Sequence, residues 1–386
     1  MNNIPPLDLT KQYETIGEEV NTAVLEVLAS GRYIGGPVVQ SFEQQFANYI
    51  GVSESVSCNS GTDSLYLALR SLNIGPGDEV ITTPFTFIAT AEVISAVGAT
   101  PVFVDINADT FNIDVNLIEA AINSRTRAII PVHLFGQPAP MSEIMAIAAK
   151  QGLMVIEDCA QAAGARWDGK RVGSIGHIGC FSFFPTKNLG AFGDGGACTT
   201  SLPEIAANMR MLKEHGSRKR YHHEVTGINS RLDVIQAAIL QIKLRYLDFW
   251  NEGRAKVATR YQELLSSIPG LILPQEPAGG QGVWNQYTIR VKSQEDKCKF
   301  NYRDVVRDKL HEKGVMAMVY YPLALHLQEV YEKLGYVSGQ LPIAEQAANQ
   351  VLSLPMFPEL TQEQQEQVVY SLKDCLAEVN QILGDG

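Results

Sequence analysis

The sequence predicts an α/β fold in which a large domain with a mostly parallel sheet is followed by a smaller α+β domain. The chain has 386 residues, more than a single core usually accommodates. Apolar residues make up 45% of the chain and charged residues 19%, as in ordinary folded proteins. Up to about residue 200, short β-branched runs alternate with helical stretches. This alternation is typical of βαβ units.

The large domain is expected to span residues 1–250 and to begin with an amino-terminal arm. Apolar residues at helical spacing predict a helix over 13–30, and the glycine-rich segment 31–37 separates it from a second helix over 38–50. Five β-branched runs then predict strands of a sheet that is covered by helices on both faces. These runs are 79–83, 101–105, 128–132, 153–157 and 197–200.

The small domain is expected to span residues 251–386. A long amphipathic helix over 231–265 should lead into it, and the segment 251–253 could interrupt this helix. Thr361 and Gln364 have the spacing of a capping box and predict the start of a last helix. The other predicted elements are a strand over 283–291, a helix over 302–313 and a strand over 315–321.

Charge and cysteine usage exclude several classes of protein. The net charge of −11 argues against a nucleic-acid partner. The amino terminus has no basic region followed by an apolar core, and no apolar run approaches membrane-spanning length, so we expect a cytoplasmic protein without a membrane partner. The cysteines show no Cys-x-x-Cys pair and are expected to be reduced and mostly buried. They are Cys58, Cys159, Cys180, Cys198, Cys298 and Cys375.

Lys187 and Asp158 are the first candidates for chemistry. Lys187 lies in the apolar, glycine-punctuated segment 181–197, where burial would lower the pKa of the amine and allow it to form a Schiff base with a carbonyl. Asp158 follows the strand-like run 153–157, and a buried carboxylate is costly unless a cation or a protonated ring nitrogen meets it. Together they predict pyridoxal phosphate, whose aldehyde needs the amine and whose ring nitrogen needs the carboxylate. Alone, Asp158 could simply cap the next helix.

The segment 59–65 could bind the phosphate of this cofactor. It places Gly61, Thr62 and Asp63 at the expected start of a helix, where free backbone N–H groups and the helix dipole favour an anion. The alternative is that Ser60 or Thr62 only caps the helix, which is the commoner arrangement.

Three further side chains could contact the cofactor. Ser182 lies five residues before Lys187, close enough for its hydroxyl to reach the same phosphate, although it could be a buried serine bonded to backbone. The ring of Phe87 could stack on a flat heteroaromatic ligand, although an aromatic here is more often core. Gln161 could hydrogen-bond the oxygen edge of the ring, or could be a capping or surface amide.

Taken in order, these segments resemble those of fold-type I pyridoxal phosphate enzymes, and specifically of the DegT/DnrJ/EryC1/StrS sugar aminotransferases. The resemblance covers nearly the whole chain and implies a mostly parallel seven-stranded sheet between helices. It is carried by the segments 31–37, 59–63, 75–81, 86–90, 132–136, 157–161, 181–196 and 229–238.

The resemblance implies a role for each candidate. Lys187 would hold the cofactor as an internal aldimine and move the proton, while Asp158 would pair with the ring nitrogen. Asn229 would reach the cofactor phosphate of the neighbouring subunit in a homodimer with shared active sites. The residues implied to bind the cofactor are Gly61, Thr62, Asp63, Phe87, Asp158, Gln161, Ser182, Lys187 and Asn229. No metal is expected.

The substrates implied are L-glutamate, which leaves as 2-oxoglutarate, and a nucleotide-linked keto-sugar that receives the amine. The product would be an amino sugar for a surface polysaccharide or a glycosylated metabolite. Segments 219–224 and 227–233 look most like members that aminate carbon 3, including those acting on a UDP-linked 3-keto-N-acetylglucosaminuronate, and carbon 4 is the alternative. Tyr320 stands where several relatives place histidine. Candidate sugar contacts are Arg218, His222, His223, Arg231, Tyr321 and His326, the first four arriving across the subunit interface.

Three other readings compete with this one. Family members that act as dehydratases replace the lysine with histidine, and Lys187 stands against that reading. A cofactor-retaining regulatory protein of the same family is a second alternative, but the intact set of Lys187, Asp158, Gln161 and Ser182 favours an enzyme. A nicotinamide dehydrogenase would need Gly-x-Gly-x-x-Gly after a first strand, and this is absent from the sequence.

Overall fold

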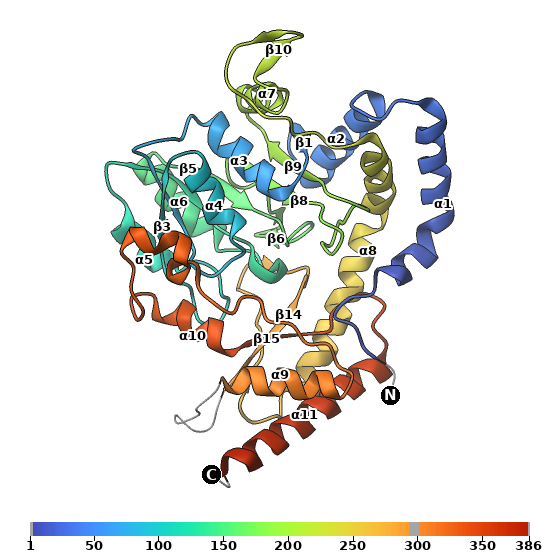
Figure 1. The fold of residues 1–386 in the computed structure, drawn as a ribbon, viewed down its shortest axis with the longest axis vertical. Coiled ribbons are helices and arrows are strands. Elements are labelled where there is room, and N and C mark those ends of the chain that lie inside the picture. The colour runs from blue at the N-terminus through green and yellow to red at the C-terminus, as the bar shows by residue number, and fades with distance from the viewer. Residues whose placement is uncertain (1–2, 293–300, 385–386) are drawn as a thin grey trace.

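The computed structural model describes residues 3–292 and 301–384, and its centre is a seven-stranded sheet (Figure 1). The strand order is β1-β9-β8-β5-β4-β2-β3, and β9 is the one strand antiparallel to its neighbours. The strands are β1 (Glu54–Cys58), β2 (Glu79–Thr82), β3 (Thr100–Phe103), β4 (Thr126–Ile130), β5 (Met154–Asp158), β8 (Ile178–Ser182) and β9 (Gly196–Thr200). The expected mostly parallel seven-stranded sheet is confirmed.

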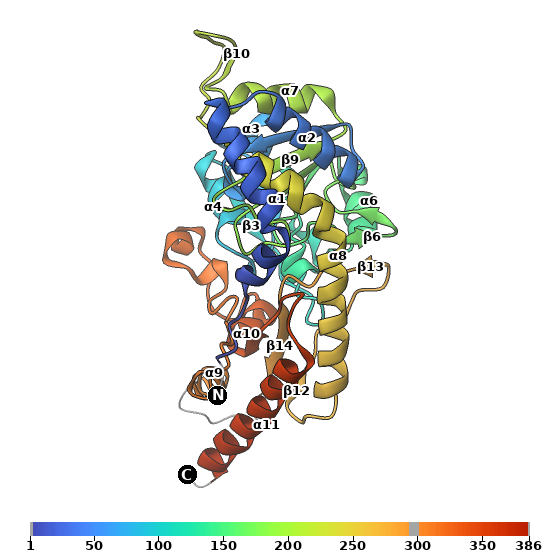
Figure 2. The ribbon, with the colours of Figure 1, turned by 90° about the vertical axis from the view of Figure 1, so that its right-hand side faces the viewer.

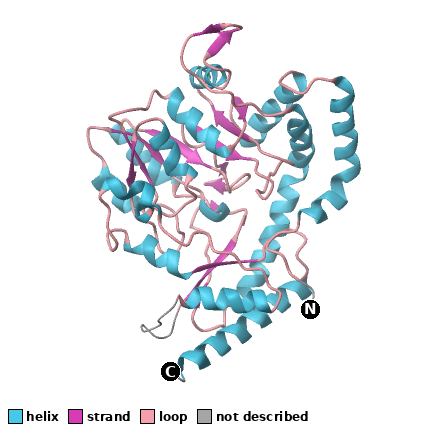
Figure 3. Ribbon diagram, in the orientation of Figure 1, coloured by secondary structure: helices cyan, strands magenta, loops and turns pink. Residues whose placement is uncertain are grey.

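Helices cover both faces of this sheet, as Figure 3 shows. Alternate residues of the strands point to opposite faces: Ile156 packs with α3, α4 and α7, whereas Val155 packs with α5 and α6. Phe181 joins a further cluster with α2 and α8. The helices are α2 (Pro37–Ile50), α3 (Gly61–Ser71), α4 (Ala89–Ala96), α5 (Val115–Ala121), α6 (Met141–Gln151), α7 (Pro203–Leu212) and α8 (Val234–Leu265).

All five predicted strands of the sheet are present, with ends that differ by one or two residues. The strands β1 and β8 were not predicted. In β1, Ser55 and Ser57 interrupt the apolar run, and in β8 Gly179 weakens the strand pattern. Gly179 is required by packing, because a Cβ there would lie 2.4 Å from the Cα of Gly173.

The amino-terminal helix α1 (Leu9–Ser30) lies along α8 (Figure 2). Ile16 of α1 packs with Ile239 of α8. The expected interruption of α8 at 251–253 is wrong, because the helix runs unbroken through Gly253. The glycine is needed for close packing instead: a Cβ there would lie 2.9 Å from the Cβ of Pro358.

The carboxyl-terminal part of the chain contains a three-stranded sheet with order β12-β14-β15. The expected capping box is confirmed: the Gln364 N–H donates to the Thr361 hydroxyl, and the Thr361 N–H donates to the Gln364 side chain. The elements here are β12 (Leu271–Ile272), β14 (Tyr287–Val291), α9 (Tyr302–Glu312), α10 (Pro342–Gln350), β15 (Val351–Leu354) and α11 (Gln362–Gly384).

The predicted strand over 315–321 is wrong. Val315 pairs with Ile4, and Met318 pairs with Ser353, through isolated bridges rather than a ladder. Because Ile4 also enters the carboxyl-terminal core, the first residues of the chain pack with its last third. The division at residue 250 stays a prediction, and α8 crosses it as one helix.

Short elements complete the fold. They are β6 (Arg166–Trp167), β7 (Lys170–Arg171), β10 (Ser217–Lys219), β11 (His222–His223), β13 (Gly280–Gln281) and the 3₁₀ turns at Leu134–Gly136, Leu325–Leu327 and Glu329–Leu334. The five cysteines in the described residues are buried and free of disulfides, and Cys298 lies outside the described residues. Among the helices of 3–292 and 301–384, none is long and apolar enough to span a membrane.

Candidate active site

A cavity of about 520 Å³ lies where the carboxyl ends of β5 and β8 meet the amino ends of α3 and α4. Ligands of open α/β sheets bind at this edge. Seven of the nine residues predicted to bind the cofactor line the cavity, and the predicted sugar contact Tyr321 lines it as well. The seven are Gly61, Thr62, Phe87, Asp158, Gln161, Ser182 and Lys187.

Lys187 lies in the loop that joins β8 to β9. Two backbone hydrogen bonds of Phe183, with Gly195 and Ala191, hold the ends of this loop together, and the Lys187 N–H donates to the carbonyl of Phe184. Burial lowers the pKa of the Lys187 amine to about 8, and the nearby charge of Asp158 opposes this shift. Part of the amine is therefore neutral near pH 7 and can attack a carbonyl.

We expect the capture of an aldehyde by Lys187 to speed up with pH and to level off above about 8, because the ammonium form cannot attack. Stopped-flow absorbance after mixing cofactor-free protein with pyridoxal phosphate measures this rate. Lys187→Ala is the control for reaction at other amines. A rate that keeps rising to the 10.5 of an ordinary lysine would contradict the assignment.

Asp158 ends β5 with its side chain at the cavity and is 5% exposed. Its two carboxylate oxygens each accept one hydrogen bond, from the Ala160 N–H at 3.1 Å and from the Thr90 hydroxyl at 2.8 Å. Burial raises the pKa of this carboxyl, and the two hydrogen bonds oppose the rise. Each oxygen keeps acceptor capacity, so the carboxylate fits a cationic N–H of a ligand.

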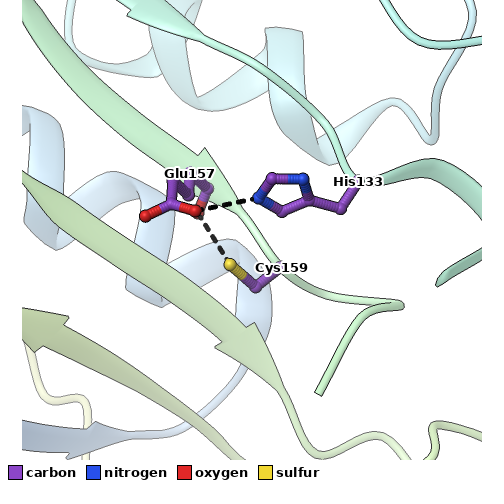
Figure 4. A group of neighbouring side chains, drawn as sticks. All are labelled: His133, Glu157 and Cys159. Carbon is purple, nitrogen blue, oxygen red and sulfur yellow. Dashed lines mark hydrogen bonds and ion pairs between the residues drawn. The ribbon is translucent and has the colours of Figure 1, made fainter. Parts of the chain in front are cut away.

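A buried group behind Asp158 consists of His133, Glu157 and Cys159, whose potential ligand atoms lie within 4.8 Å of one another (Figure 4). His133 Nδ1 accepts the Ala139 N–H, so Nε2 carries the proton that faces Glu157 at 3.0 Å. The Glu157 carboxylate also accepts three backbone N–H groups, from Gly173, Ile175 and Gly176. Both oxygens of Glu157 are thereby hydrogen-bonded, and these bonds fix the end of β5.

The amino end of α3 forms one wall of the cavity. Ser60 caps the helix by accepting the Asp63 N–H, while the N–H groups of Gly61 and Thr62 belong to the first turn, which lacks helical acceptors. Ser182 lies against Gly61, and these groups together could bind a phosphate. Asp63 does not line the cavity; its carboxylate accepts the Ser230 hydroxyl at 2.6 Å. The structure therefore argues against contact between the Asp63 side chain and the cofactor.

We expect Gly61→Ala to weaken the binding of pyridoxal phosphate about 10- to 100-fold, because a Cβ would lie 2.6 Å from the Cβ of Ser182 and overpacking typically costs 1–3 kcal/mol. Titration of cofactor-free protein, followed by absorbance, gives the dissociation constant. Gly75→Ala is the matched control, since its added Cβ would meet Val97 at an ordinary 3.6 Å. Equal affinities of the two variants would contradict a phosphate site at Gly61.

The side-chain amide of Gln161 has a fixed orientation. Its oxygen accepts the Phe135 N–H at 2.6 Å, and its NH₂ donates to the Tyr321 hydroxyl at 3.3 Å. The NH₂ group is thus available to an acceptor oxygen in the cavity. Phe87 is 57% exposed, and its ring centroid lies 6.2 Å from that of Tyr321, so it can cover a flat ligand from the mouth of the cavity.

Five of the predicted residues, all within residues 218–231, lie outside this cavity. Arg231 forms an ion pair with Glu214 at 2.6 Å and donates to the side chain of Asn229. Arg218 is paired with Glu224 in the β10–β11 hairpin, which projects from the body of the molecule (Figure 2). His222 and His223 are exposed in the same hairpin. None of the five lines the cavity of its own chain.

His326 was predicted to contact the sugar, and the structure argues against it. The side chain is 0% exposed, and Nε2 lies 3.1 Å from the carboxylate of Glu345. Its ring also packs against Tyr336. His326 therefore belongs to the packing of the 3₁₀ turns and not to the cavity wall.

Several residues that line the cavity were not predicted from the sequence. They are Thr86, Thr90, Phe184, Thr186, Asp194, Gln286 and Tyr320. A signal existed for two of them, since Thr86 and Thr90 are the ends of the segment 86–90, one of those that carry the family resemblance.

Fold and site together define an α/β enzyme whose cavity joins an amine of lowered pKa, a buried carboxylate and the amino end of a helix. Residues 14–373 match the DegT/DnrJ/EryC1/StrS aminotransferase family. The chain belongs to this family.

Individual relatives match along almost their whole length. The chain is 50% identical to a pleiotropic regulatory protein of Geobacillus stearothermophilus, covering 96% of this chain and 98% of that one. It is 48% identical to the UDP-N-acetyl-3-dehydro-alpha-D-glucosamine 3-aminotransferase of Acidithiobacillus ferrooxidans, covering 94% and 95%. The crystal structure of Streptomyces venezuelae DesV in complex with a ketimine intermediate superposes with a TM-score of 0.93 at 44% identity, covering 97% and 98%.

Proposed function

We propose that this protein is a pyridoxal phosphate-dependent aminotransferase that transfers the amine of L-glutamate to carbon 3 of a nucleotide-linked keto-sugar. The observation that carries the proposal is the presence of the Lys187 amine, with a pKa of about 8, and the Asp158 carboxylate in one cavity. The family, and the relatives named for 3-amino transfer, support the reaction and its position on the sugar.

The residues present fit the cofactor. Gly61, which has no room for a Cβ, would bring the first turn of α3 close to the phosphate beside Ser182, and Thr62 would add its N–H. Asp158 would face the ring nitrogen, and the Gln161 NH₂ would donate to the oxygen edge of the ring. When bound, pyridoxal phosphate acts as an electron sink that stabilises negative charge at the substrate carbon.

The chemistry of this chain's own residues then follows. A free Lys187 amine could remove a proton from the substrate carbon that bears the amino group and return it elsewhere as a general acid. A pKa of about 8 suits both roles near neutral pH. Asp158, held by Thr90 and Ala160, would supply the negative charge that pairs with the ring nitrogen.

The homodimer belongs to the proposal. Asn229, Arg231, Arg218, His222 and His223 lie outside the cavity of their own chain, and we infer that they act at the cofactor phosphate and sugar of a second copy. Two aromatic side chains at the cavity are exposed in the single chain, Phe87 at 57% and Phe184 at 50%. Their exposure supports the proposal that a second copy covers them. Tyr321 and Tyr320 would contact the sugar from within. We further propose a cytoplasmic location and a product used for a surface polysaccharide or a glycosylated metabolite.

A regulatory role is the second candidate, because the relative at 50% identity is called a pleiotropic regulatory protein. A retained Lys187–Asp158 site favours catalysis over regulation alone. If the protein is an enzyme, transfer of the amine to carbon 4 of the sugar is the alternative to transfer to carbon 3.

A panel of 3-keto and 4-keto nucleotide sugars, linked to UDP or dTDP and assayed with glutamate, tests the function. We expect the purified protein to be yellow, to bleach with glutamate, and to release 2-oxoglutarate with the 3-keto sugars. Activity on 4-keto sugars alone would refute the position. A protein that binds pyridoxal phosphate but transfers no amine from glutamate to any of these sugars would refute the enzymatic proposal in favour of the regulatory one.

A further inference from the structure

Two buried hydroxyl groups lie beside Asp158, one in the loop before α4 and one in the first turn of that helix. The Thr90 hydroxyl lies 2.8 Å from one oxygen of Asp158, and the Thr86 hydroxyl lies 3.1 Å from that of Thr90. Thr86 and Thr90 are 3% and 1% exposed. The three groups therefore form a short chain of hydrogen bonds that leads from the loop before α4, through its first turn, to the carboxylate.

The direction of this chain depends on the charge of Asp158. An ionised carboxylate can only accept, so Thr90 must donate its single hydroxyl proton to Asp158. Its lone pairs can then accept the proton of Thr86, and both protons point toward the carboxylate. Hydrogen bonds of this kind to a charged group are stronger than neutral ones and polarise one another.

The surroundings otherwise oppose the ionised form. Asp158 is buried, and removing a carboxylate from water favours its neutral acid. The donors that oppose this effect are the Thr90 hydroxyl on one oxygen and the Ala160 N–H on the other. The Lys187 ammonium adds to them and favours the carboxylate, and the other titratable neighbours are the His133 imidazole and the Tyr321 hydroxyl, whose pKa burial raises.

We propose that Thr90, supported by Thr86, is a positioning residue that keeps Asp158 ionised and aimed at the cavity, and thereby sets the protonation of a bound pyridine nitrogen. The statement about the pyridine nitrogen rests on the proposed function. The statement about the ionisation of the Asp158 carboxyl does not require a bound cofactor.

The cofactor-free test is a ¹³C NMR titration of the Asp158 carboxyl, assigned by its absence from Asp158→Asn. We expect a higher pKa in Thr90→Val, which keeps the volume and loses the donor, and a smaller rise in Thr86→Val. Thr90→Ser should restore the wild-type titration. Thr82→Val is the matched control, because Thr82 is equally buried and donates at 2.8 Å to the carbonyl of Ile130. An unchanged Asp158 titration in both Thr90→Val and Thr86→Val would overturn the proposal.

The loaded protein gives a second readout, the ¹⁵N NMR signal of pyridoxal phosphate labelled at the ring nitrogen. We expect the nitrogen to stay protonated in wild type and Thr90→Ser and to lose its proton at lower pH in Thr90→Val, with amino transfer slowed about 10- to 100-fold. A wild-type protein that does not bind the label would refute the proposed function, and the carboxyl titration would still decide the role of Thr90. A protonated nitrogen in Thr90→Val at every pH at which wild type is protonated would overturn the inference alone.

Discussion

Replacing Lys187 with alanine is expected to abolish amino transfer, with a loss in turnover of at least about 10⁴-fold, the upper range of general acid–base catalysis. The loop from 183 to 195 places the Lys187 amine at the cavity that also contains Asp158, and burial lowers its pKa to about 8. Alanine removes both the group that binds the aldehyde and the group that moves the proton. Turnover with glutamate, and mass spectrometry of the protein after borohydride treatment, measure the two losses separately.

Lys243 provides a matched control because it is buried like Lys187 but lies outside the candidate active site. It is 1% exposed, burial lowers its pKa to about 8, and its amine lies 5.2 Å from the ring of Phe192 and 5.7 Å from that of Trp250. It does not line the cavity. We expect Lys243→Met to keep turnover and the borohydride adduct. Residual transamination by Lys187→Ala, or an adduct on Lys243 in the wild type, would refute the role of Lys187.

Local patterns were sufficient to predict the positions that the backbone itself determines. Asp158 ends β5, Gly61 begins α3 and Lys187 lies in the loop that follows β8, and apolar runs and glycine mark such positions in the sequence. The capping box at Thr361 is local for the same reason, since both of its hydrogen bonds span three residues.

Side-chain directions that depend on distant partners could not be predicted in this way. Asp63 turns to Ser230, which is 167 residues away in the chain, and Thr90 reaches Asp158 across 68 residues. His326 turns to Glu345 and away from the cavity. Tertiary packing determines each of these side-chain directions, and hydrophobic periodicity in the sequence does not encode that packing.

The errors in secondary structure have the same origin. The composition of the segment 315–321 predicts a strand, but the segment forms only isolated β-bridges, one with Ile4 and one with Ser353. Gly253 reads as a helix breaker, but the approach of Pro358 requires a residue without a Cβ inside a continuous helix. In both cases a distant segment decides what a local preference leaves open.

The second large effect is expected for Asp158→Asn, with a loss in turnover of about 10²- to 10³-fold, as for removal of one preorganised charge-stabilising group. The amide has nearly the shape of the carboxylate, so its oxygen can still accept the Ala160 N–H and its NH₂ can meet Thr90. It carries no charge and cannot hold a proton on a ring nitrogen. We therefore expect turnover to fall while cofactor content, measured by absorbance, stays close to that of the wild type.

A cofactor whose ring nitrogen carries a permanent positive charge distinguishes an electrostatic role of Asp158 from a structural one. In Asp158→Ala the space of the carboxylate is free, and an N-methylated pyridoxal phosphate would place its methyl group there while keeping the positive charge that Asp158 normally stabilises. We expect this analogue to restore part of the turnover of Asp158→Ala and to gain nothing in Lys187→Ala, whose missing amine no ring charge can replace. Equal activity of Asp158→Ala with the methylated and the natural cofactor would show that Asp158 acts through the fold of β5 and not through charge.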